Sequence, residues 1–298
     1  MKKTIIAAAV AASVAAPAAF ADVSISGMVN PEMATQNDDS VDFTTNTDLV
    51  FKGSEDLGNG MKASFKYHLF HDGKEDEAGT GNDHGGKVAD TSVTLSGDFG
   101  AVTVGRQETM HEGVMQAFVN IDASHDADLE NTINNASIGD RDNGSIKYMS
   151  PNMNGFSMGV QLASKNDTDD DAADVSDVMV KYSNGGITVM AEQIDVDGGA
   201  QATAFAASYK MGDIEVRALT RTHETSAGVE TDTDFLGVKY NMGNIALAAG
   251  TIDDDTNGDA DIYSVAYKFS KRTSVYAVLE NSDATAEDQT VIGLKHTF

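Results

Sequence analysis

The feature that most constrains the fold of this chain is a two-residue alternation of apolar and polar side chains. It recurs along almost the whole sequence beyond residue 21, for instance in the stretches at 61–69, 156–163, 214–219 and 263–269. Such alternation predicts strands with one apolar and one polar face. No apolar run near 18 residues follows residue 21, so the sequence predicts no transmembrane helix.

The connections between these strands alternate between two kinds. Short turn-like segments lie at 54–60, 97–100, 150–155, 183–186, 210–213, 241–244 and 270–272. Longer, acidic segments lie at 71–87, 165–174, 195–199, 223–230, 253–259 and 281–288. This order predicts consecutive antiparallel hairpins whose short turns all lie at one end.

The same breaks divide the chain into sixteen strands. Their expected starts are residues 23, 44, 61, 89, 101, 144, 155, 176, 187, 200, 213, 232, 244, 260, 272 and 288. An even number places both termini at the short-turn end. Strands of about 9–11 residues are long enough to cross a bilayer when tilted.

The first 21 residues have the pattern of a secretory signal peptide. Lys2 and Lys3 precede an apolar stretch, and Ala19-Phe20-Ala21 forms an A-x-A cleavage site. The predicted domains are therefore a signal peptide at 1–21 and one further domain at 22–298. An exported chain without a membrane helix is either a soluble secreted protein or a transmembrane β-barrel.

Three features favour one closed barrel over a secreted β-sandwich. Sixteen regular strands without a helix suit a single barrel, which cannot be divided without opening an edge. A β-sandwich with Greek-key crossovers does not require short and long connections to alternate strictly. The polar faces also carry many charged residues, which suits a water-filled lumen.

Composition excludes other classes. The absence of cysteine excludes disulfide scaffolds, cysteine-ligated zinc and thiol nucleophiles. A net charge of -27 argues against nucleic-acid binding, which needs clustered Lys and Arg. We identify no catalytic residues and expect no cofactor.

Several stretches resemble a known family. GSEDLGNGMKASF (53–65), GDFGAVTVGRQ (97–107), YMSPNMNGFSMGV (148–160), AYKFSKRTSVYAVLEN (266–281) and GLKHTF (293–298) are similar to general porins of Gram-negative outer membranes. The resemblance runs in order along the chain beyond residue 21. It implies a sixteen-stranded antiparallel transmembrane barrel with short periplasmic turns and long extracellular loops, assembled as a homotrimer in the outer membrane.

The resemblance also implies partners and a role for the C-terminus. The expected partners are outer-membrane lipids, lipopolysaccharide, the barrel-assembly machinery and small hydrophilic solutes. In the last strand, Ile292, Leu294, His296 and Phe298 share one face, so the terminal aromatic is expected to face lipid at the interface. The family implies that Phe298, with His296, is the signal read by the assembly machinery.

In the family, the third long loop folds into the lumen and forms a constriction. The stretch 108–141 is the longest connection and the third of the long kind, as expected of a functional loop. Its apolar members Phe118 and Ile121 could pack against the inner wall. Its candidate acidic pore residues are Glu108, Glu112, Asp122, Asp126 and Asp128.

The candidate basic residues of the opposite pore wall are Arg106, Lys66, Lys52 and Lys147. We choose Arg106 because it lies in the VGRQ motif, and the three lysines because the alternation of their strands places them on the face toward the lumen. Strict alternation, however, puts Arg106 on the face of Val102 and Val104. If those valines face lipid, a bulge or strand end at Gly105 is needed to bring Arg106 into the lumen.

The expected function is passive diffusion of small hydrophilic solutes and ions. Removal of Lys2 and Lys3 leaves a charge of 18 − 47 = −29, which predicts mild cation selectivity. The alternatives are an outer-membrane barrel hydrolase and a secreted acidic adhesin or calcium-binding β-protein. A weak calcium-loop match is offered by Asp253, Asp255, Asn257 and Asp261, although Ser264 replaces the usual Glu.

Overall fold

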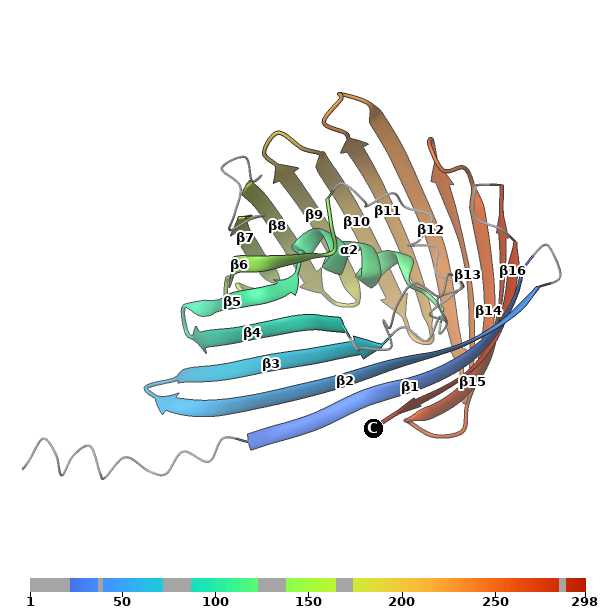
Figure 1. Ribbon diagram of the computed structural model, residues 1–298, viewed down its shortest axis with the longest axis horizontal. Coiled ribbons are helices and arrows are strands. Elements are labelled where there is room, and N and C mark those ends of the chain that lie inside the picture. The colour runs from blue at the N-terminus through green and yellow to red at the C-terminus, as the bar shows by residue number, and fades with distance from the viewer. Residues whose placement is uncertain (1–21, 37–39, 72–86, 123–137, 165–173, 284–287) are drawn as a thin grey trace, which may run out of the picture.

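A computed structural model of the 298-residue chain gives its architecture (Figure 1). The structure describes residues 22–36, 40–71, 87–122, 138–164, 174–283 and 288–298. The predicted signal peptide lies outside these residues. No helix in the described part of the chain is long and apolar enough to cross a membrane.

The described residues form a closed barrel of sixteen antiparallel strands in which each strand pairs with its neighbours in sequence and β1 pairs with β16. The first eight strands are β1 (Asp22–Gln36), β2 (Val41–Gly58), β3 (Met61–His71), β4 (Lys87–Gly97), β5 (Gly100–Glu108), β6 (Arg141–Met149), β7 (Phe156–Ser164) and β8 (Asp174–Asn184). The other eight are β9 (Ile187–Val196), β10 (Gln201–Met211), β11 (Ile214–Glu224), β12 (Glu230–Met242), β13 (Ile245–Asp254), β14 (Ala260–Lys268), β15 (Thr273–Ser282) and β16 (Gln289–Thr297). The fold prediction is confirmed, and no predicted strand start differs from the observed one by more than three residues.

The barrel closes where the two ends of the chain meet. The backbone N–H of Gly27 donates to the carbonyl of Phe298 at 3.0 Å, and the N–H of Phe298 donates to the carbonyl of Gly27 at 3.0 Å. The start of β1 and the C-terminus lie at the same end of the barrel (Figure 1). This is the end of the short turns, called the turn end below; the opposite end is the loop end.

The alternation in sequence becomes an alternation between the two faces of the wall. In β7, Phe156, Met158 and Leu162 are exposed on the outer face, whereas Gln161 and Ala163, on either side of Leu162, are buried on the inner face. A closed barrel can afford this arrangement in lipid, because every backbone group of the wall is paired. The outer apolar face is therefore the surface that the sequence assigns to lipid.

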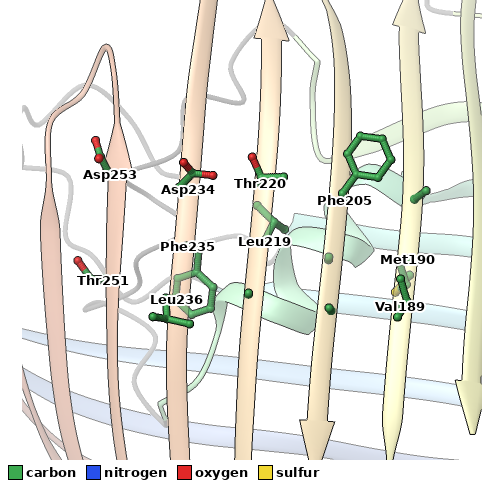
Figure 2. Close-up of a pocket in the computed structure, with 14 residues that line it drawn as sticks. Val189, Met190, Phe205, Leu219, Thr220, Asp234, Phe235, Leu236, Thr251 and Asp253 are labelled. Carbon is green, nitrogen blue, oxygen red and sulfur yellow. The ribbon is translucent and has the colours of Figure 1, made fainter.

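Figure 2 shows the wall from β9 to β13. Phe205 and Leu236 belong to the exposed apolar surface. Asp234 and Asp253 lie nearer the loop end than Leu236 (Figure 2). Carboxylates are costly in hydrocarbon, so the apolar band ends below these two residues.

Candidate functional site: a helix and charged walls in the barrel lumen

A short helix lies inside the barrel. Helix α2 (Met110–Val119) follows β5 within the long connection and packs on the inner wall of β8 to β12 (Figure 1). The hydroxyl of Thr109 caps its N-terminus by accepting a hydrogen bond from the N–H of Glu112 at 3.1 Å. The prediction that the third long loop folds into the lumen is confirmed.

Apolar packing holds this helix against the wall. Val114, Met115 and Phe118 are buried in one cluster with inward side chains of the wall, among them Leu219 and Phe235 (Figure 2). Burying a large apolar side chain is worth about 1.5–3 kcal/mol. The expected packing of Phe118 and Ile121 on the inner wall is confirmed, since both belong to this cluster.

Polar contacts fix both ends of the helix. Near its start, Nδ1 of His111 lies 2.8 Å from Oε2 of Glu192, and the N–H of His111 donates to Oδ2 of Asp177 at 3.0 Å. Past its end, Arg217 donates to the carbonyl of Asn120 at 3.0 Å. Sequence reasoning missed these three wall residues as partners. Strand alternation identifies them as inward-facing, but their contacts depend on where the loop lies.

The wall formed by β2, β3 and β4 carries a second group of charges. Nζ of Lys66 lies 2.6 Å from Oδ2 of Asp90. The ring of His68 lies between two carboxylates, 2.8 Å from Asp48 and 3.2 Å from Asp90. These side chains share the inward face, because the register pairs Lys52 with Lys66 and His68 with Asp90.

The strand β6 adds two basic residues beside the start of the loop. Arg141 lies 3.4 Å from the carboxylate of Glu108, and Nζ of Lys147 donates to the carbonyl oxygen of Glu108 at 2.6 Å. Lys52, Lys66 and Lys147 therefore face the lumen. Among the described residues, Lys52 takes part in no ion pair.

The placement of Arg106 in the lumen is wrong. Arg106 pairs regularly with Thr91 in β4, as Val104 pairs with Val93, so it shares the outer face with those exposed valines. Its guanidinium donates to the carbonyl of Val88 at 3.0 Å and to the side chain of Asn143. The register between β5 and β6 does shift beside Gly105, but the extra residue lies in β6 and leaves Arg106 outward.

The five acidic candidates have different positions. Glu108 ends β5 and contacts Arg141. Glu112 is buried and accepts a hydrogen bond from Gln116 at 2.7 Å, so it stabilises the first turns of α2. Asp122 follows the helix and is half-buried, whereas Asp126 and Asp128 lie outside the described residues.

The calcium candidates do not converge. Asp254, which was not a candidate, organises the connection between β13 and β14 by accepting from the N–H groups of Thr256 and Asn257 at 3.1 and 2.8 Å. Asp253 and Asp261 belong to two different strands, and Asp255 and Asn257 lie between them. Within the described ranges, no three His, Asp or Glu side chains are arranged to hold a metal ion.

At the C-terminus, Phe298 is exposed on the outer face with Ile292 and Leu294, as the alternation predicts. His296 shares that face and its Nδ1 lies 2.9 Å from the hydroxyl of Thr273. The aromatic ring thus lies outside the wall at the turn end.

The site as a whole is a lumen with an apolar, helix-covered side and charged sides. Fixed charges of both signs next to water can attract, orient and solvate small polar solutes. This part of the molecule has the features of a passage rather than of a reaction centre.

Comparisons with known proteins agree with this geometry. A family model described as Gram-negative porin matches residues 7–287. The outer membrane porin protein 32 of Delftia acidovorans is 28% identical, with 96% of this chain and 91% of that protein covered. The solved anion-selective porin from Comamonas acidovorans has a TM-score of 0.70 at 23% identity, covering 94% of this chain and 100% of that one. The trimer form of OmpT, an outer membrane protein of Vibrio cholerae, has a TM-score of 0.68 at 15% identity, covering 93% and 99% of the two chains.

Proposed function

Because the chain belongs to the family of Gram-negative porins, we propose that it forms a water-filled channel of the outer membrane through which small hydrophilic solutes and ions diffuse passively. The observation that carries the proposal is the position of α2. The helix packs on β8 to β12, and the charged side chains of β2, β3, β4 and β6 lie on other parts of the wall. This arrangement narrows the lumen, but apolar packing does not fill it.

In this channel, size exclusion and fixed charge provide the selectivity. The proposed constriction has Lys52, Lys66 and Lys147 on the wall, and Glu108 and Asp122 on the loop; Asp126 and Asp128 remain candidates from the sequence. Glu112 has a supporting role, since its carboxylate is buried in the loop. Charges that face each other across a narrow passage would orient dipolar solutes and disfavour apolar ones.

The expectation of mild cation selectivity is not supported. It rested on the net charge of the chain, whereas selectivity depends on the charges that line the passage. A porin of similar fold is described as anion-selective, and three of the four basic candidates face the lumen here. A reversal potential measured in a salt gradient decides the sign.

We also propose that the chain assembles as a homotrimer and is exported by its signal peptide. A homotrimer is supported by the trimer form of the similar Vibrio cholerae protein. Contacts with outer-membrane lipids and lipopolysaccharide are supported by the exposed apolar outer face. Recognition of Phe298 by the barrel-assembly machinery and cleavage after Ala21 stay predictions, which N-terminal sequencing and a Phe298→Ala assembly assay test directly.

The decisive experiment is recording of the purified protein in a planar bilayer. We expect stable conductance that rises in units of three equal steps, because each protomer of a trimer carries its own passage. A protein that folds and inserts but never conducts would contradict the channel. In that case, esterase and peptidase assays test the barrel hydrolase, and folding without detergent would favour the secreted β-protein.

A further inference from the structure

The charges on the inner wall are sorted along the barrel axis. Toward the turn end, unmatched lysines face inward on five strands; we call Lys52, Lys181, Lys210, Lys239 and Lys268 the basic ring. Each lies no more than six residues from the turn end of its strand, with Lys52 the farthest at six residues before Gly58. Together they belong to β2, β8, β10, β12 and β14, so they surround much of the lumen.

Toward the loop end, the inner wall is acidic. We call the seven inward carboxylates of this zone the acidic belt: Glu32, Asp48, Asp90, Asp142, Asp177, Asp254 and Glu280. Each lies seven to ten residues from the turn end of its strand. They outnumber the arginines at the same level, Arg141 and Arg221.

At about 3.3 Å per residue, Lys181, Lys210, Lys239 and Lys268 lie at least four residues, or roughly 13 Å, nearer the turn end than any belt carboxylate, which exceeds the Debye length of about 8 Å at physiological salt. Lys52 lies at the inner edge of the ring, one residue nearer its turn end than the first belt carboxylates. The two zones therefore act as separate fields.

Two belt carboxylates, Asp48 and Asp90, contact the basic side chains of His68 and Lys66. Four other belt carboxylates accept hydrogen bonds from neutral donors. The donors are the N–H of His111 for Asp177, Gln161 for Asp142, Thr233 for Asp254 and Gln289 for Glu280. In the described part of the chain, no ion pair involves any lysine of the ring, and Lys268 lies 3.3 Å from the side-chain oxygen of Asn241.

Two other inward acids at the turn end have basic neighbours. Glu215, an inward acid at this end, is bonded to Arg217 at 2.7 Å. Asp56 and Lys62 face each other across the pair β2–β3. The ring therefore leaves an excess of positive charge.

We propose that the basic ring is an anion-binding vestibule at the turn end of the channel, which takes small oxyanions with more than one negative charge, such as phosphates and polycarboxylates. The inference rests on the proposed channel function and adds a polarity to it. Ammonium groups on flexible stems bind such anions as point charges, and several around one lumen act together. The acidic belt repels the same anions, so their access is from the turn end.

A positive zone in series with a negative zone also makes conduction depend on direction. When the loop-end compartment is positive, cations enter through the acidic belt while anions enter through the basic ring, and both accumulate in the lumen. The opposite voltage depletes both ions. The current is therefore larger with the loop end positive.

The test uses the full-length protein in a planar bilayer with a known orientation. The chain contains no cysteine, so Ser226→Cys in the connection between β11 and β12 marks the loop end with a biotin label that streptavidin detects. At equal and opposite voltages in about 0.1 M KCl, we expect a current ratio of at least roughly 1.5, which falls toward 1 in about 1 M KCl, where the Debye length is about 3 Å. Conducting channels with a ratio near 1 at low salt would overturn the proposal while leaving the channel function intact.

Inorganic tripolyphosphate probes the vestibule itself. We expect it to block the current from the turn end at a concentration at least tenfold lower than from the loop end. The double variant Lys210→Gln/Lys239→Gln removes two charges of the ring, and we expect it to lose most of this difference. The matched control Lys271→Gln/Arg272→Gln removes two charges from the turn beyond β14, and we expect it to keep the difference in block between the two ends.

Folding of each variant is verified by the heat-dependent mobility shift on SDS gels. Equal block from both ends in the wild-type channel, or an unchanged sidedness in the folded ring variant, would contradict the vestibule. Absence of any conductance would instead contradict the proposed channel.

Discussion

At the scale of single residues, the inner wall contains a glycine that is covered by an aromatic ring. The buried ring of Tyr276 lies over Gly293 in the neighbouring strand, so a Cβ at this position would overlap Cζ and Oη of Tyr276. The hydroxyl of Tyr276 donates to Oε1 of Glu32 at 2.5 Å, which fixes the ring in place. The tyrosine can therefore not move aside without losing this buried hydrogen bond.

We predict that Gly293→Ala destabilises the barrel by about 1–3 kcal/mol, the usual cost of overpacking. Unfolding in urea, followed by the gel mobility shift, measures the change. Gly144→Ala is the matched control, since nothing lies within 4 Å of a Cβ at Gly144, and we expect a change of less than about 0.5 kcal/mol. Equal stability of the two variants would show that the ring does not constrain position 293.

Arg106 shows what residue-level prediction can and cannot give. The alternation correctly put Arg106 on the face of Val102 and Val104, and the motif alone suggested the lumen. Whether Arg106 lies on the outer face or in the lumen depends on which strand contains the extra residue of the bulge. That residue is in β6, about 40 positions away in sequence, so no inspection of residues 101–107 could decide it.

At the scale of elements, α2 is fixed by contacts at both ends. We predict that Glu192→Ala, which removes the carboxylate beside His111, loosens the start of the helix. A hydrogen bond to a charged group is worth about 1.5–3 kcal/mol. We expect noisier single-channel currents with transient decreases in conductance, because the loop then leaves the wall and enters the passage.

Gln193→Ala is the control for this variant, because Gln193 follows Glu192 in β9 and faces outward. Its currents should match those of the wild-type channel. If Glu192→Ala folds and its current noise equals that of Gln193→Ala, the contact with His111 does not hold the loop.

The strands could be predicted from sequence, whereas the helix could not. Period-two alternation depends only on which face of the wall each residue occupies, so it survives in the sequence of every strand. Helix α2 has only 10 residues and contains Gly113, and isolated helices of this length are marginal in water. Its stability comes from Leu219, Phe235 and other wall residues, which belong to strands far from the helix in the sequence.

At the scale of the whole molecule, the two faces of the wall respond differently to the same added charge. We predict that Val178→Arg, at an exposed outer position in the middle of β8, lowers the stability in lipid bilayers by about 2–4 kcal/mol. Ser208→Arg, on the inner face of β10 opposite Arg217, should cost less than this, because water hydrates the guanidinium and salt screens its repulsion from Arg217. Folding equilibria in lipid vesicles measure both, and similar costs would contradict the assignment of the outer face to lipid.

The number of strands and the position of the termini follow from the sequence, but the effect of the net charge does not. A sum of -27 over the chain mixes acidic connections with the lining of the lumen. The sorting of the basic ring from the acidic belt becomes visible only when the strands are aligned by their turns. Position along the axis, and not total charge, determines what an ion meets.

The mutual hydrogen bonds of Gly27 and Phe298 mean that the first strand to leave the ribosome receives its second neighbour only when the last one has arrived. Until then, two rows of unpaired amides remain, which hydrocarbon does not tolerate. Closure of the wall thus requires β1 and β16 together, and a chain cut short before β16 would be left with an open edge.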